Sequence, residues 1–178
     1  MSANINTKKL QLWLEQTPSK VLGALKNKKN LTSDLLFLQG EAHRLLGSFQ
    51  PAIATYARAL KISVQAEERM DILLAMAACY RTLGIAAMAY ELADDALHMA
   101  QELEYDEYVV RAMQEMAMAL RAWGKLDAAL EMLDLVLAAY TQEKDYAGMS
   151  FICWAKGGVL HQDAPRLAAP GSPSTCRC

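Results

Sequence analysis

Apolar residues recur three and four residues apart through most of the chain, which is the spacing of one face of an α-helix. Each such run predicts an amphipathic helix with its apolar face in the core. Glycine and proline are few, at 9 and 5 residues, while alanine, leucine, methionine, glutamate and glutamine are abundant. The pattern therefore predicts an all-α fold. Two clear runs are Leu73, Met76, Ala77 and Tyr80, and Met113, Met116, Ala117 and Leu120.

Three segments align with one another as internal repeats, each made of two predicted helices around one glycine. The glycines are Gly47, Gly84 and Gly124, which lie 37 and 40 residues apart. A small residue stands seven positions before each glycine and an alanine five positions after it, so the paired helices can approach closely. The small residues are Gly40, Ala77 and Ala117, and the alanines are Ala52, Ala89 and Ala129.

These units resemble the tetratricopeptide repeat (TPR) family over about residues 33–160. The resemblance implies a right-handed α-solenoid of antiparallel helix pairs. The units are longer than the family's typical 34 residues and lack its closing proline, and in length they resemble the arrays of kinesin light chains and bacterial peptide-sensing regulators. The resemblance is carried by Leu36, Gly40, Gly47, Phe49, Ala52, Tyr56, Ala59 and Leu60, then by Leu73, Ala77, Tyr80, Gly84, Ala89, Ala96 and Leu97, and lastly by Gly124, Leu126, Ala129 and Leu137.

The repeats define three parts of the chain. Residues 1–31 are expected to form a degenerate helix pair that covers the apolar end of the first repeat. Residues 32–163 hold the repeats, at about 33–66, 70–103 and 110–143, followed by the first helix of a fourth unit at Tyr146–Gln162. Residues 164–178 are rich in proline, glycine and serine, so we expect a disordered tail there.

Composition and charge indicate the cellular environment of the protein and limit the classes of partner that it is expected to bind. With 53% hydrophobic and 21% charged residues the chain is a folded domain, and no apolar run approaches the roughly 20 residues that span a bilayer. No signal peptide is evident, so we expect a cytoplasmic protein without membrane contact. Residues 1–30 carry six lysines and one glutamate but no arginine, a pattern that indicates solvated helix faces rather than a nucleic-acid site.

Candidate binding residues lie on the first helix of each unit, which lines the concave face in the family that the repeats resemble. Arg44, Arg81 and Arg121 each stand three residues before a hinge glycine. Guanidinium groups bind carboxylates in bidentate fashion, so the three arginines predict a site for a peptide with acidic groups. In the alternative interpretation each arginine pairs with an acidic residue of its own or the adjacent helix. The resemblance adds as groove residues Phe37, Glu41, Leu74, Ala78, Gln114 and Met118.

The sequence thus predicts a protein-interaction adaptor that binds a peptide or helix of a partner protein in a concave groove. Two alternatives stay open at this point. One is a homo-oligomerisation module, because Phe151 and Trp154 on the last helix lack the covering of an interior helix. The other is a sensory or regulatory input segment of a longer protein.

Catalytic chemistry is not predicted, and neither is a cofactor or a metal. The three histidines, His43, His98 and His161, lie far apart in the sequence and none has a second ligand at metal-binding spacing. Two cysteines, Cys176 and Cys178, make a poor metal site on an expected disordered end. No nucleophile elbow or phosphate-binding loop is present in the sequence.

Overall fold

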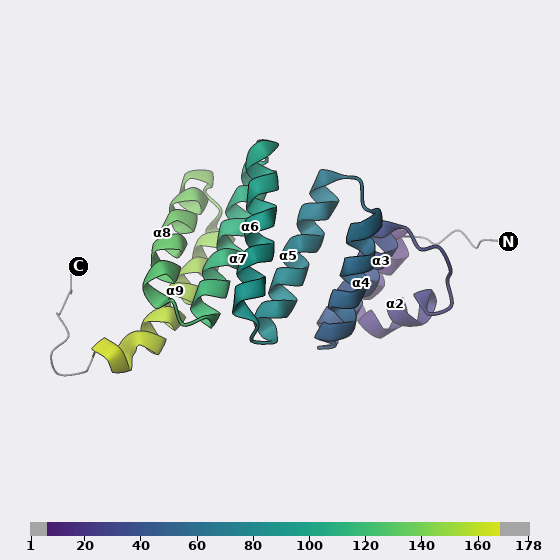
Figure 1. Cartoon of the computed structure of the whole chain (residues 1–178), viewed down its shortest axis with the longest axis horizontal. Coiled ribbons are helices and arrows are strands. Elements are labelled where there is room, and N and C mark those ends of the chain that lie inside the picture. Colours follow the sequence, from purple (N-terminus) through teal and green to yellow (C-terminus); the bar gives the residue numbers. More distant parts are fainter. Residues whose placement is uncertain (1–6, 168–178) are drawn as a thin grey trace.

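The computed structural model describes residues 7–167, and within this range the chain forms nine helices and no strand. The helices lie side by side along the long axis of the molecule, from α2 near the N-terminal end to α9 near the C-terminal end (Figure 1). The predicted all-α fold is confirmed. The helices are α1 (Thr7–Gln16), α2 (Pro18–Leu25), α3 (Ser33–Leu45), α4 (Phe49–Ile62), α5 (Ala66–Thr82), α6 (Ala86–Glu102), α7 (Asp106–Ala122), α8 (Leu126–Glu143) and α9 (Tyr146–Leu167).

The hinge glycines end the first helix of each pair in the left-handed conformation. At Gly84, where φ is 79°, the backbone N–H donates to the carbonyl of Arg81 at 3.0 Å. The next N–H, of Ile85, donates to the carbonyl of Tyr80 at 2.9 Å. These two bonds form a Schellman motif, which satisfies helix-end carbonyls and favours glycine because glycine has no Cβ. The same bonds recur at Gly47 and Gly124.

The ends of α6 and α8 use the same turn without glycine. Glu104 and Lys144 both have a φ of 58°. The N–H of Glu104 donates to the carbonyl of Gln101 at 3.3 Å, and the N–H of Tyr105 donates to that of Ala100 at 2.9 Å. A side chain in this conformation costs about 1–2 kcal/mol. The turns between repeats therefore hold backbone strain that a glycine would remove.

The core consists of apolar layers between successive helices, and its closest approach is at Gly40. The ring of Tyr56, from α4, lies against Gly40 of α3 and is fully buried. A Cβ added at Gly40 would meet Cδ1 of that ring at 2.6 Å and Cζ at 3.0 Å. The small residue at this position is therefore required by the ring that faces it.

Helices α1 and α2 cover the outer side of the first repeat. Leu10, Val21 and Leu25 are buried there against Leu38 and Ala42 of α3. This packing removes the apolar side of α3 from water, as terminal units of a solenoid must.

Helix boundaries differ from the predicted units in three places. Helices α5 and α7 begin at Ala66 and Asp106, each four residues before the expected starts at 70 and 110. Their first turns contain acidic residues, which favour a helix N-terminus through the helix dipole but add nothing to the apolar pattern. Helix α9 continues to Leu167, past the expected end of the repeats at 163. The rest of the predicted tail, including Cys176 and Cys178, lies outside the described residues.

Helix α9 closes the C-terminal side of the stack. Ile152, Ala155 and Val159 are buried in the core that α9 shares with α8. Phe151 and Trp154 stay 38% and 63% exposed, with their ring centroids 5.7 Å apart. The helix therefore packs back on the third repeat and still leaves an aromatic pair in solvent. Of the helices in residues 7–167, none has the length and apolar character needed to cross a membrane.

Candidate functional site: a groove on the first helices

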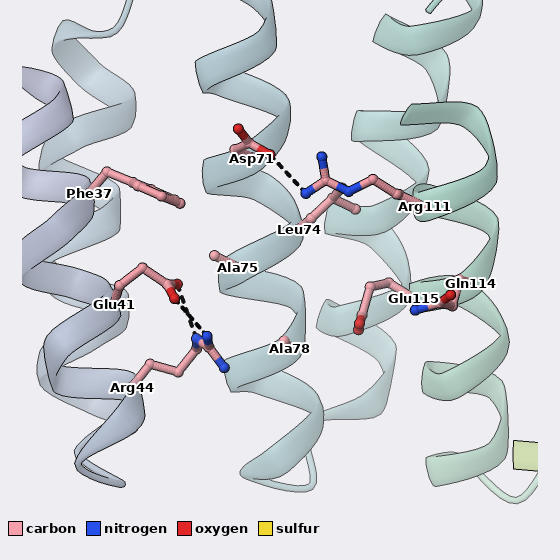
Figure 2. Close-up of a pocket in the computed structure, with 10 residues that line it drawn as sticks. All are labelled: Phe37, Glu41, Arg44, Asp71, Leu74, Ala75, Ala78, Arg111, Gln114 and Glu115. Carbon is pink, nitrogen blue, oxygen red and sulfur yellow. Dashed lines mark hydrogen bonds and ion pairs between the residues drawn. The ribbon is translucent and has the colours of Figure 1, made fainter. Parts of the chain in front are cut away.

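A groove lies along the first helices of the three repeats, α3, α5 and α7, and holds a cavity of about 340 Å³ (Figure 2). In Figure 2 Phe37 points from α3 toward α5, where Ala75 and Ala78 leave space. Leu74 adds a further apolar wall. The polar residues of the lining are Glu41, Arg44, Asp71, Arg111, Gln114 and Glu115.

Glu41 is the centre of a hydrogen-bonded network at one side of the groove. Arg44 donates to its carboxylate through Nε at 3.0 Å and Nη2 at 2.6 Å, and the Tyr56 hydroxyl donates to Glu41 Oε1. The hydrogen bond to Glu41 raises the pKa of Arg44 above its ordinary value, and burial raises the pKa of Tyr56. At neutral pH Arg44 is therefore charged, and Tyr56 keeps the proton that it donates.

A second ion pair bridges two repeats. Arg111 of α7 donates to Asp71 of α5 at 2.8 Å, as the dashed line in Figure 2 shows. The guanidinium also lies 4.7 Å from the ring centroid of Tyr108. Burial alone would lower the pKa of Arg111, but its hydrogen bond to Asp71 and the charge of that carboxylate outweigh it, so the pKa is raised. Arg111 therefore stays charged, and its hydrogen bond to Asp71 links α5 to α7.

The other two predicted arginines have partners of their own. Arg81 donates to Glu115 of the next repeat at 3.3 Å. Arg121 lies outside the cavity, where it donates to Gln162 at 3.4 Å and its guanidinium lies 5.7 Å from the Trp154 ring centroid. Pairing with an acidic residue of the same or the adjacent helix is thus observed for Arg44 and Arg81, whereas the partner of Arg121 is a neutral amide.

Most of the residues that the resemblance assigned to the groove do line it. The structure brings together Phe37, Glu41, Arg44, Leu74, Ala78 and Gln114. Met118 does not join them. It is 8% exposed and packs in the core with α8 and α9, because α9 covers the side of α7 on which it stands.

Sequence reasoning missed four lining residues, namely Asp71, Ala75, Arg111 and Glu115. One signal was available. Asp71 and Arg111 lie 40 residues apart, which is the distance between Gly84 and Gly124. They therefore occupy the same position in consecutive repeats, and opposite charges at such positions face each other across adjacent helices.

A second cavity, of about 510 Å³, continues the groove toward the start of the first helices. It shares Phe37 and Asp71 with the first cavity. Four carboxylates line it, and no lysine or arginine does. Its lining consists of Thr7, Gln11, Asp34, Phe37, Leu38, Gln65, Glu67, Glu68, Asp71 and Tyr108.

The described residues offer little for covalent or metal chemistry. Within residues 7–167 no group of three or more His, Cys, Asp or Glu side chains is placed to hold a metal ion. Burial raises the pKa of Cys79 to about 11, so its thiol is protonated at neutral pH and packs as a small apolar side chain.

Similar solved structures are two crystal structures of nearly identical TPR-like repeats from Podosopora anserina, described as repeats of a kinesin light chain. The first is 19% identical with a TM-score of 0.54, and the alignment covers 93% of this chain and 91% of that one. The second, a variant of that protein with one glutamine replaced by methionine, is also 19% identical with a TM-score of 0.55 and covers 91% and 88% of the two chains. No protein-family model and no curated protein matches the sequence. The predicted solenoid is confirmed, and the fold of this chain is that of TPR-like repeats.

Proposed function

We propose that the chain is a protein-interaction module that binds a peptide or a helix of a partner protein in the groove of α3, α5 and α7. The observation that carries the proposal is the groove itself, in which equivalent positions of three repeats line one cavity with both apolar and charged side chains. Phe37 and Leu74 line that space at the positions where an incoming side chain would lie. Apolar contacts of this kind supply most of the affinity in peptide recognition.

The ion pairs of the groove support the same function. Glu41 with Arg44 and Asp71 with Arg111 hold their side chains in place before any ligand arrives. A preorganised lining loses less conformational entropy on binding, which favours affinity for a shape that fits.

The decisive experiment fills the groove with a bulky charge. Ala78→Arg places a long side chain in the cavity, and Ala54→Arg places the same side chain on the exposed outer face of α4 as a matched control. Random peptides of about twelve residues are selected by display on the immobilised chain, and their affinities are then measured by fluorescence anisotropy. The helical circular dichroism of each variant is recorded first.

We expect the selected peptides to lose at least about tenfold in affinity for Ala78→Arg, which corresponds to about 1.4 kcal/mol. Ala54→Arg should bind them as the natural chain does. If no peptide is selected, or if both variants bind equally well, the groove is not the binding site. These substitutions are preferable to reversing Arg44 and Arg81, whose loss would break ion pairs inside the protein.

A second candidate function is self-association through α9. Its support is the pair of neighbouring, solvent-exposed rings of Phe151 and Trp154, since apolar surface in water favours association. Sedimentation velocity across a hundredfold concentration range tests it. A mass that rises to that of a dimer in the natural chain, and not in Trp154→Ser, supports this function; a constant monomer mass excludes it.

A further inference from the structure

The second cavity extends the groove beyond the ion-paired region and has a different electrostatic character. It is bounded by α1, α3, α5 and α7, and Phe37 and Asp71 line both this cavity and the first one. At about 510 Å³ it has room for a long side chain together with its backbone. A ligand that occupies the first cavity would therefore reach into the second.

Two of the four carboxylates of this cavity are not paired within the described part of the protein. Of the four, Asp71 has Arg111 as its partner at 2.8 Å. Asp34 and Glu67 have no ion-pair or hydrogen-bond partner among residues 7–167. The lining therefore carries negative charge that a bound cation would offset.

Glu68, the fourth carboxylate of the lining, has a hydrogen-bond partner at only one of its two oxygens. Its Oε2 accepts a hydrogen bond from Ser63 Oγ at 2.5 Å, while its Oε1 is buried and has no hydrogen-bond partner. A buried carboxylate oxygen without a donor is costly, because it has lost water without gaining a replacement. Because this oxygen has almost no accessible surface, a ligand in the cavity does not reach it, and Glu68 contributes only its charge to the lining.

The apolar lining suits the rest of such a ligand. The rings of Phe37 and Tyr108 stand at the cavity together with Leu38. Lysine and arginine side chains combine an aliphatic stem, which packs on rings, with a cationic head that pairs with carboxylates. The lining matches both parts of that chemistry.

We propose that the second cavity is a subsite for a lysine or arginine side chain of the bound peptide, held by Asp34 and Glu67 beside the rings of Phe37 and Tyr108. This inference rests on the proposed function, because it names the chemistry of one part of the same ligand. The sequence had instead suggested a partner with acidic groups. The partner then presents a basic residue at this end and apolar residues toward Leu74.

The test uses a positional-scanning library of acetylated twelve-residue peptides, in which one position at a time is fixed as arginine, leucine or glutamate. Retention is measured on the natural chain, on Asp34→Asn/Glu67→Gln, and on Asp95→Asn/Glu102→Gln. The last variant removes the same number of charges from the exposed outer face of α6 and serves as the control. Ala78→Arg identifies the retention that depends on the groove.

We expect arginine at one position to raise groove-dependent retention about fivefold or more over leucine, as an opposite charge at an unpaired carboxylate does. The preference should vanish in Asp34→Asn/Glu67→Gln, persist in the control, and weaken as salt rises from about 50 to about 500 mM. Groove-dependent retention without an arginine preference, or with a glutamate preference, overturns the subsite and leaves the proposed function standing. Retention that Ala78→Arg does not reduce overturns both.

Discussion

Replacing Gly40 with alanine tests whether the contact with Tyr56 sets the geometry of the first repeat. The added Cβ would lie 2.6 Å from Cδ1 of the ring and still nearer to Cε1, distances that force a displacement. Tyr56 has little freedom to move, because it is fully buried and its hydroxyl donates to Glu41. Gly40 therefore matters because the space that a Cβ would fill is occupied by the Tyr56 ring.

The expected magnitude is a balance of two terms. Overpacking of a tight core costs typically about 1–3 kcal/mol, and the better helix propensity of alanine returns about 1 kcal/mol. We expect a net loss of about 1–2 kcal/mol in the free energy of unfolding. Gly23→Ala is the matched control, since a Cβ there meets nothing within 4 Å; it should stabilise the protein by up to about 1 kcal/mol.

A double-mutant cycle makes the reasoning sharper. The third repeat has Ala117 and Leu133 at the positions of Gly40 and Tyr56, and both are fully buried in one core cluster. Tyr56→Leu should cost about 2–3 kcal/mol through the volume that it removes. In that background Gly40→Ala should stabilise, because the new methyl group has space and the propensity gain remains. The substitution thus changes sign with its neighbour.

The assay is urea unfolding followed by circular dichroism in the far ultraviolet, with the natural chain and the four variants compared at equal concentration. A shift in the midpoint at constant slope reports the change in stability. The reasoning is refuted if Gly40→Ala has the same effect, in sign and size, in both backgrounds. It is refuted as well if the substitution stabilises the natural chain as much as Gly23→Ala does.

Three further predictions concern turns, thiols and pH. Residues 84 and 104 both have a positive φ, which favours glycine. Gly84→Ala should therefore lower the free energy of unfolding by about 1 kcal/mol, and Glu104→Gly should raise it by up to about 1 kcal/mol. Urea unfolding measures both changes. In native protein at about pH 8 a thiol reagent should label the exposed Cys153 within minutes and Cys79 only on unfolding. Peptide mapping identifies the labelled cysteine, and equal labelling of the two would contradict the burial of Cys79. Burial lowers the pKa of His43 in the folded state, so the unfolded state binds more protons at this residue. The contribution of His43 to the free energy of unfolding should therefore be lost as pH falls below about 6.5, the ordinary pKa of histidine. His43→Gln should make the free energy of unfolding less dependent on pH in this range.

The helix pairs were predictable because their signals are local. A glycine at regular spacing indicates a left-handed turn at a helix end, and the spacing of the apolar residues on either side indicates which helix face is buried. The starts of α5 and α7 were missed because their first turns are acidic and carry no apolar phase. The strained turns at Glu104 and Lys144 gave no signal either, since neither residue type favours a positive φ.

The groove was only partly predictable, because its charges depend on contacts between repeats. Arg81 with Glu115 and Asp71 with Arg111 join residues 34 and 40 positions apart. Which arginine finds a partner depends on the offset between adjacent helices, and that offset is set by packing rather than by spacing alone. Met118 shows the same limit, since only the position of α9 buries it.

In this chain the residue that recurs on the first helix of every unit is held by contacts within the protein. Arginine recurs at the same position in all three units, yet Arg44 and Arg81 are held by Glu41 and Glu115. The position of Phe37 changes in every unit, to leucine and then to glutamine, and all three side chains line the cavity. A position that keeps its residue through a repeat array serves the structure common to the units, whereas a position that varies gives each unit its own surface. Specificity in this groove should therefore follow the variable positions. Substitutions of Phe37 or Gln114 should change which peptide is bound without unfolding the array, whereas Leu74 is 6% exposed in the core and its substitution should also lower stability.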